Sequence, residues 1–217
     1  MLKEFKYVKK EVRGMVEDAL HMQKELYQFL DAFADGEIPG DEYSLGELKK
    51  FIQSVVKNQR KADRFFRVDG YWSLLPKGTH MPSDARVDFV YIPTYIAVSI
   101  LTLFLERFPE EAMTIENYID TLHDGIYFAS TRGLRGAGYE AEEGVIEAIR
   151  ILSKGKVFSY LSKNVENDER LRPLYEIVSQ KLTHYQELVR ENKSLDYGFS
   201  KITPEKIKEI LKLIERG

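Results

Sequence analysis

The chain has 217 residues, of which 43% are hydrophobic and 31% are charged, and its net charge is −3. This composition is typical of a soluble globular protein with one sizeable core, and the near-neutral charge provides no field that would attract nucleic acid. The absence of cysteine excludes disulfides, thiolate metal sites and cysteine nucleophiles. The opening segment MLKEFKYVKKEVRG is charged throughout and has no apolar stretch, so we expect no signal peptide and a cytoplasmic protein.

A long amphipathic helix is predicted over residues 5–33. Its apolar positions recur at spacings of three and four, which is typical of a coiled-coil-like seam about four heptads long. The seam consists of Phe5, Val8, Val12, Met15, Ala19, Met22, Leu26, Phe29 and Phe33. The segment DGEIPGDEY (35–43) contains two glycines and a proline, which predicts that the helix ends there.

A second helix is predicted to begin at Ser44, because Ser44 and Glu47 have the form of a capping box. A second seam follows at Leu48, Ile52, Val55, Gln59, Ala62 and Phe66. The two helices predict an antiparallel hairpin over residues 1–66. This hairpin is either an arm of the core or a dimerisation surface, and we predict a homodimer that uses the helix 5–33 at least in part.

The middle of the chain joins a long polar loop, residues 67–91, to a very apolar helix that ends at about Arg107. Pro93 fits the first turn of this helix, where its missing amide costs nothing. The uncharged run Phe89–Leu105 is shorter than the about 20 residues that span a bilayer, so it predicts a buried core helix rather than a membrane segment. Four of its side chains are expected to be almost fully buried: Ile96, Ile100, Leu103 and Phe104.

The rest of the chain also predicts helices, over residues 115–130 with Thr114 as cap, 139–153, 170–192, and after the cap Thr203-Pro204-Glu205. The stretch VFSYL (157–161) is the one strand-like alternative. We therefore predict an all-α fold. The N-terminal hairpin (1–66) packs on a bundle of helical hairpins (67–217) and forms one compact unit with it.

Three stretches share a rhythm: DARVDFVYIPTYIAVSILTLF, then TIENYIDTLHDGIYF, then GAGYEAEEGVIEAIRIL. Over residues 84–152 this rhythm resembles the α/α-toroid proteins, the protein prenyltransferase and terpenoid cyclase group. The resemblance implies a toroid-like arrangement and the position of a pocket. It implies no activity, because the chain lacks the cysteine of the prenyltransferase zinc site and the acidic proton-donor motif of the cyclases, and is too short for a full toroid.

Two local patterns in the middle of the chain could bind ligands. Asp84 and Asp88 lie four residues apart and could hold a divalent cation, or they form an acidic helix entry that pairs with Arg86 or Arg67. The glycine-rich segment 133–138, with Arg132 and Arg135, has the form of an anion-binding loop before a helix. Glutamates in the first turn of that helix argue instead for a tight turn that lets two helices pack closely.

The histidines show no metal-ligand spacing, but His80 lies near Asp84 and His123 precedes Asp124, so either could form an acid–base pair. Charges beside an apolar helix must pair or face water, so we expect the loop to approach the turn 123–143. The ligand-binding candidates are Arg67, Asp69, Trp72, His80, Asp84, Arg86, Asp88, Tyr95, His123, Arg132, Arg135 and Tyr139.

Two classes of function fit these patterns. The first is a binding or interaction protein that self-associates through its N-terminal helix. The second is a small-ligand enzyme, with an isoprenoid- or sugar-type substrate, whose site lies between the 67–95 loop and the 123–143 turn. No complete catalytic motif decides between them. We expect no metal or cofactor, and neither nucleic acid nor a membrane as partner.

Overall fold

The computed structural model describes residues 10–40, 44–63, 66–77, 79, 87–134, 139–196 and 201–216. Helices dominate these residues, which confirms the predicted all-α class. The α-helices are α1 (Lys10–Asp35), α2 (Leu45–Lys57), α3 (Ile92–Arg107), α4 (Pro109–Met113), α5 (Tyr118–Phe128), α6 (Tyr139–Lys154), α7 (Val157–Asn164), α8 (Arg172–Arg190) and α9 (Pro204–Arg216). The other elements are the π-helical turns η1 (Val87–Tyr91) and η2 (Ala129–Gly133) and an antiparallel pair of short strands, β1 (Leu195–Asp196) and β2 (Lys201–Ile202).

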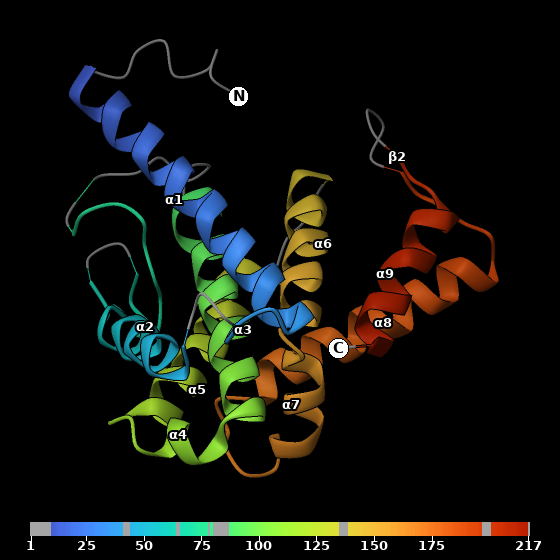
Figure 1. Cartoon of the computed structure of the whole chain (residues 1–217). Coiled ribbons are helices and arrows are strands. Elements are labelled where there is room, and N and C mark those ends of the chain that lie inside the picture. The colour runs from blue at the N-terminus through green and yellow to red at the C-terminus, as the bar shows by residue number, and fades with distance from the viewer. Residues whose placement is uncertain are drawn as a thin grey trace.

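Helix α3 forms the centre of the fold (Figure 1), and α1, α2, α4, α5, α6 and α7 all contact it. Every residue from Pro93 to Phe104 is buried. The predicted burial of four side chains is confirmed, since Ile96, Ile100, Leu103 and Phe104 are at most 1% exposed. The stretch Phe89–Arg107 is long and apolar enough to cross a membrane, but most of it is buried inside the protein, as a core helix requires.

Helix α1 ends in a Schellman motif, in which Gly36 adopts a φ of 86° and its amide donates to the carbonyl of Phe33 (3.3 Å). The side chain of Arg107 on α3 also donates to the last carbonyls of α1, those of Phe33 and Ala34. Phe33, the last residue of the predicted seam, is buried within the same chain, so this end of the seam belongs to the core. Self-association through the remaining seam stays a prediction, and Met22 is the exposed member among the seam side chains that the structure describes, at 46%.

Helix α2 begins as predicted but ends earlier. The Ser44 hydroxyl accepts from the Glu47 amide (3.3 Å), and the Glu47 carboxylate accepts from the Ser44 amide (2.9 Å), which confirms the capping box. The predicted seam beyond Val55 is wrong, because the helix stops at Lys57 and the Asn58 side chain caps the carbonyl of Ser54 (2.9 Å). The following segment turns back, and Arg60 forms an isolated β-bridge with Tyr71.

Three further predictions meet different outcomes. Helices α6, α8 and α9 occupy the predicted stretches, and Pro204 begins α9. The expected cap at Thr114 is wrong, because Thr114 closes the short helix α4 and α5 begins after Asn117, which has a left-handed φ of 58°. The strand-like alternative over residues 157–161 is also wrong, because that stretch lies in α7.

The first part of the predicted 67–91 loop is packed against the helices. Its apolar side chains form a second small core with α1, η1 and the end of α5: Ala19, Phe66, Tyr71, Leu75, Phe89, Val90 and Phe128. Gly70 has a φ of 98° and lies so close to α5 that a Cβ there would overlap the carbonyl of Asp124. The loop is therefore held against α5 at the position of Asp124.

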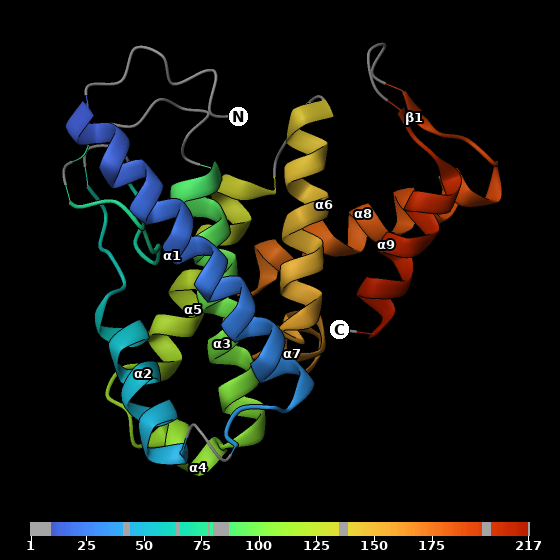
Figure 2. The same ribbon diagram turned by 45° about the horizontal axis from the view of Figure 1, so that its top comes forward.

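Helices α8 and α9 pack on each other, and α9 also packs on α6, so that this pair extends to one side of the bundle (Figures 1 and 2). Apolar residues of one α9 face are buried in this contact: Ile207, Ile210, Leu211 and Ile214. The strands β1 and β2 lie at the outer end of the pair. A main cluster of buried side chains runs from α1 through α3 and α6 to α9, so these helices share one hydrophobic core.

Candidate functional site

The first polar region that we consider is centred on His123. His123 lies on α5 and is buried, with 8% of its side chain exposed. Its Nδ1 atom lies 2.7 Å from Oδ2 of Asp168, in the α7–α8 connection, and its Nε2 atom lies 2.6 Å from the hydroxyl of Tyr160 on α7. A single imidazole therefore ties α5 to two later parts of the chain.

Arg170 extends this arrangement to two more carboxylates. Its guanidinium donates to Asp168 (2.6 Å), to Asp124 (2.9 Å) and to Asp120 (2.9 Å). We call these six residues, Asp120, His123, Asp124, Tyr160, Asp168 and Arg170, the His123 network. One guanidinium donates to three carboxylates. Removal of the Arg170 side chain would therefore leave three negative charges close together.

The protons of the His123 network can be assigned from the charges. Hydrogen bonds from Arg170, and then from His123, hold the pKa of Asp168 well below its usual value, although partial burial opposes this. An ionised carboxylate only accepts, so we assign a proton to Nδ1 of His123. When only Nδ1 carries a proton, Nε2 is the acceptor of the hydrogen bond from the Tyr160 hydroxyl. Burial, followed by the charge of Asp168, raises the pKa of Tyr160 to about 12, so this hydroxyl keeps its proton at neutral pH.

An open polar cleft with a cavity volume of about 900 Å³ lies beside this network, lined in part by Lys61, Asp120, Asp124 and Arg170. Lys61 lies 3.4 Å from Asp69 and 3.7 Å from Asp124. Lys61, Asp120, Asp124 and Arg170 are thus each already engaged in an ion pair. This arrangement is what a structural clamp between α5, the 60–72 segment and the α7–α8 connection requires.

The structure brings some of the sequence-predicted site residues to this region. The segment from Asp69 to Trp72 lies against α5, since Gly70 contacts the backbone of Asp124 and the Trp72 ring lies over Gly125. Trp72 is buried and its indole donates to the carbonyl of Val55 (2.8 Å). Tyr95 is buried in α3, where burial raises its pKa. Arg67 is exposed on the loop surface.

The other predicted site residues fall outside the described part of the chain or are described by backbone alone. His80, Asp84, Arg86 and Arg135 lie outside the described residues. The backbone of Asp88 lies in η1, that of Arg132 in η2 and that of Tyr139 at the start of α6. Within the described residues, no group of three or more His, Asp or Glu side chains is placed to hold a metal ion.

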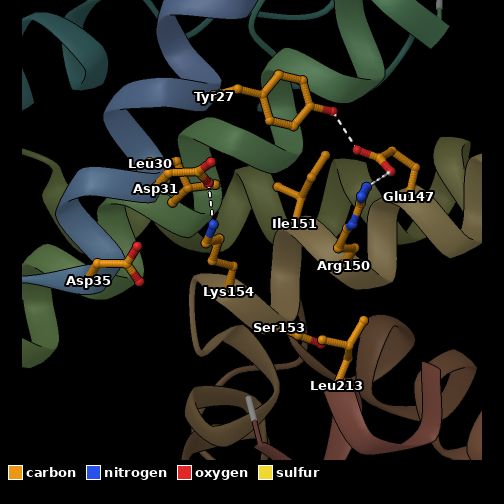
Figure 3. Close-up of a pocket in the computed structure, with 10 residues that line it drawn as sticks. All are labelled: Tyr27, Leu30, Asp31, Asp35, Glu147, Arg150, Ile151, Ser153, Lys154 and Leu213. Atoms are coloured by element: carbon orange, nitrogen blue, oxygen red, sulfur yellow. Dashed lines mark hydrogen bonds and ion pairs between the residues drawn. The ribbon is translucent and has the colours of Figure 1, made fainter. Parts of the chain in front are cut away.

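The second polar region is a cleft that the sequence did not indicate (Figure 3). It has a cavity volume of about 650 Å³ and opens between α1, α6 and α9. Ten residues line it: Tyr27, Leu30, Asp31, Asp35, Glu147, Arg150, Ile151, Ser153, Lys154 and Leu213. We call it the α1–α6–α9 cleft. Leu30, Ile151 and Leu213 give it apolar walls, while charged side chains gather on the α1 and α6 sides.

The end of α6 is positioned by close contact with α3. Gly155, just after α6, lies so close to Ser99 that a Cβ there would overlap the Ser99 side chain. The Ser99 hydroxyl in turn donates to the carbonyl of Ile151 (2.9 Å). This contact fixes the last turn of α6, so that Ser153 and Lys154 face the cleft.

Four charged side chains of the cleft are paired, either between α1 and α6 or within α6. Tyr27 on α1 donates its hydroxyl to Glu147 on α6 (2.8 Å), and Arg150 lies 3.2 Å from the same carboxylate. Lys154 on α6 pairs with Asp31 on α1. The bonds of Tyr27 and Lys154 join α1 to α6 along the cleft (Figure 3).

Ser153 differs from these neighbours. It is 6% exposed, and its hydroxyl oxygen has no hydrogen-bond partner among the residues that the structure describes. A serine in a helix commonly bonds back to the carbonyl four residues earlier, but Ser153 does not make that bond. A buried hydroxyl without a partner costs about 1–3 kcal/mol. Because Ser153 also lines the cleft, a change of its side-chain rotamer would bring this covered oxygen to a ligand atom that supplies the missing bond.

Sequence reasoning found His123 but missed its partners, because Tyr160 and Asp168 lie 37 and 45 positions away along the chain. It also missed the α1–α6–α9 cleft, whose residues come from three separate helices. Comparison with known protein families found no family model that matches the chain, and comparisons with curated proteins and with solved structures likewise found no match.

Proposed function

We propose that the protein binds a small organic molecule in the α1–α6–α9 cleft. The observation that carries this proposal is the buried Ser153 hydroxyl without a partner among the described residues. Buried polar groups in proteins are nearly always hydrogen-bonded, so an exception on a cavity wall calls for a partner from outside the chain. A cavity of about 650 Å³ is also in the usual size range for such ligands.

The walls of the cleft limit what the ligand can be. Leu30, Ile151 and Leu213 favour an apolar body, because contact with them removes apolar surface from water. The Ser153 hydroxyl favours a polar atom that reaches the wall, and it can either donate or accept. A small molecule with an apolar body and at least one polar group satisfies both requirements.

The experiment that tests this proposal blocks the cleft. A mixture of small aromatic and aliphatic acids, alcohols and amines is screened against the full chain by saturation-transfer NMR. Leu213→Trp fills the cleft from α9, and Leu182→Trp on α8 is the matched control, because Leu182 is also half-buried but does not line the cleft. We expect ligands that bind the wild type and Leu182→Trp and do not bind Leu213→Trp. Ligands that bind all three proteins equally would overturn the proposal, and so would an absence of ligands.

A second candidate function is acid–base catalysis by the His123 network. It is favoured by the chain Asp168–His123–Tyr160, in which a carboxylate orients a histidine that contacts a half-buried phenol. Because the Tyr160 pKa is raised to about 12, the phenol would serve as a proton donor rather than as a nucleophile. This candidate predicts turnover of model glycosides or phosphate esters that Tyr160→Phe abolishes and Tyr175→Phe, at an exposed tyrosine, preserves.

Three further parts of the proposal rest on the sequence. We propose that the protein is cytoplasmic, that its helices are arranged in a toroid-like manner, and that it self-associates through α1. The exposed Met22 on α1 supports self-association. Sedimentation equilibrium tests it: we expect a dimer that Met22→Asp dissociates, and a monomer at high concentration would contradict this part.

A further inference from the structure

The charges of the α1–α6–α9 cleft restrict its ligand further. Three carboxylates line it, on Asp31, Asp35 and Glu147, against two cations, on Arg150 and Lys154. One negative charge therefore remains. A cleft with apolar walls and a single surplus charge favours ligands of the opposite sign.

Pairing within the cleft shows which carboxylate carries that charge. Lys154 is engaged with Asp31, and Glu147 receives hydrogen bonds from Arg150 and Tyr27. Asp35, the last residue of α1, has no hydrogen bond or ion pair from its side chain to any residue within the described ranges. In Figure 3 it lies on the α1 side of the cleft, below Asp31.

The carbonyls just before Asp35 accept hydrogen bonds from other groups of the fold. Arg107 and the amides of Gly36 and Glu37 bond the last carbonyls of α1. Arg107 comes from α3 and contacts the ring of Phe33 on the buried side of α1. Arg107 is not among the residues that line the cleft.

We infer that the ligand of the α1–α6–α9 cleft is an organic amine with a single positive charge and an apolar body. This inference rests on the proposed function. The ammonium group pairs with Asp35 and the body contacts Leu30, Ile151 and Leu213, while the bond to the Ser153 hydroxyl requires a second polar group and is separate from the charge preference. A carboxylate of the same shape is disfavoured, because it would bring a second negative charge to Asp35.

The test uses three probes with the same body and different charge: phenylbutylamine, phenylbutanol and phenylbutyrate. Their affinities for the full chain are measured by isothermal titration calorimetry at low and at high salt. We expect the amine to bind roughly fivefold more tightly than the alcohol, which is the size of one ion pair at a partly exposed site. The acid should bind most weakly, and high salt should reduce the difference between the amine and the alcohol.

Two variants locate the charge that is responsible. Asp35→Asn removes the negative charge of Asp35 with little change of shape. Asp18→Asn removes an exposed carboxylate on the same helix, about 25 Å away by helix rise. Asp35→Asn should abolish the preference for the amine and leave the affinity of the alcohol unchanged. Asp18→Asn should preserve the preference and thus control for net charge.

The outcomes separate the inference from the proposed function. If all three probes bind equally, and Leu213→Trp abolishes their binding, the cleft is a binding site and the inference is overturned. If the amine preference persists in Asp35→Asn, the inference is likewise overturned. If no probe binds up to its solubility limit, the inference fails for this body, and the fragment screen decides the proposed function on its own.

Discussion

The His123 network and the α1–α6–α9 cleft contain the same kinds of side chain and use them differently. In the His123 network both ring nitrogens of His123 are hydrogen-bonded and Arg170 serves three carboxylates. In the cleft the pairs between α1 and α6 leave the buried Ser153 hydroxyl without a partner among the described residues. Satisfied networks hold elements together, whereas an unsatisfied group beside a cavity marks a place for a ligand.

This comparison predicts opposite responses to mutation. When one member of a satisfied network is removed, its former partners stay buried without a hydrogen bond, and the folded state loses stability. When a buried group that lacks a partner is removed, the folded state no longer carries the desolvation cost of that group. Ligand sites often contain such groups and reduce the stability of the protein. Free energies of unfolding, measured by urea titration on matched variants, therefore distinguish the two regions.

The largest effect is expected at Arg170. Arg170→Met leaves Asp120, Asp124 and Asp168 without their common partner. Loss of one member of a buried ion pair costs about 3–5 kcal/mol, but the Arg170 side chain is 32% exposed, so we expect about 2–3 kcal/mol. Lys61→Met is the control, because Lys61 is 71% exposed and its two ion pairs are longer. A loss for Arg170→Met no greater than that for Lys61→Met would contradict the clamp.

A dependence on pH follows from Asp168. Folding lowers its pKa, chiefly through Arg170, so its contribution to stability is present above the usual aspartate pKa of about 3.9 and is lost as the pH falls below it. We expect Asp168→Asn to cost about 1–2 kcal/mol near neutral pH, and we expect this difference from the wild type to shrink below about pH 4. Urea titrations at several pH values measure the difference, and a constant difference down to acid pH would argue against a lowered pKa.

The sequence predicted most of the fold because the strongest signals were local. The capping box at Ser44, the apolar run of α3 and the cap before Pro204 each depend on residues within one element. The prediction was wrong where the apolar spacing continues in the sequence beyond the residue at which the helix ends. The seam through Gln59 and Phe66 kept its spacing, but tertiary contacts turned that segment into a loop that packs on α5.

The candidate sites were much less predictable, because their residues meet only in the folded chain. His123 was singled out for its neighbour Asp124, yet the carboxylate that it contacts belongs to Asp168. Tyr160 lies in the stretch VFSYL, whose valine and aromatic residues also suit a strand. Nothing local distinguishes Ser153 from other helical serines. Its hydroxyl is buried without a partner among the described residues only once the chain has folded.

A smaller loss is expected from the tyrosine of the His123 network. Tyr160→Phe removes the hydroxyl that contacts Nε2 of His123 and leaves a buried ring nitrogen without that bond. We expect a loss of about 1–2 kcal/mol, the usual cost of an unsatisfied buried acceptor. Tyr175→Phe, at a side chain that is 39% exposed, should change stability by less than about 0.5 kcal/mol. Equal effects of the two substitutions would mean that the Tyr160 bond contributes nothing measurable.

The smallest effect is expected at Ser153, and its sign matters more than its size. Ser153→Ala removes a buried hydroxyl that has no partner among the described residues, and alanine also has the higher helix propensity. We therefore expect no loss, or a gain of up to about 1 kcal/mol. Ser99→Ala is the matched control, because Ser99 is also a buried helical serine but donates to Ile151 (2.9 Å), so its removal should cost about 1 kcal/mol. A loss at Ser153 equal to that at Ser99 would show that the Ser153 hydroxyl already has a partner within the protein. The contrast between the two regions, and the ligand site inferred from it, would then fail together.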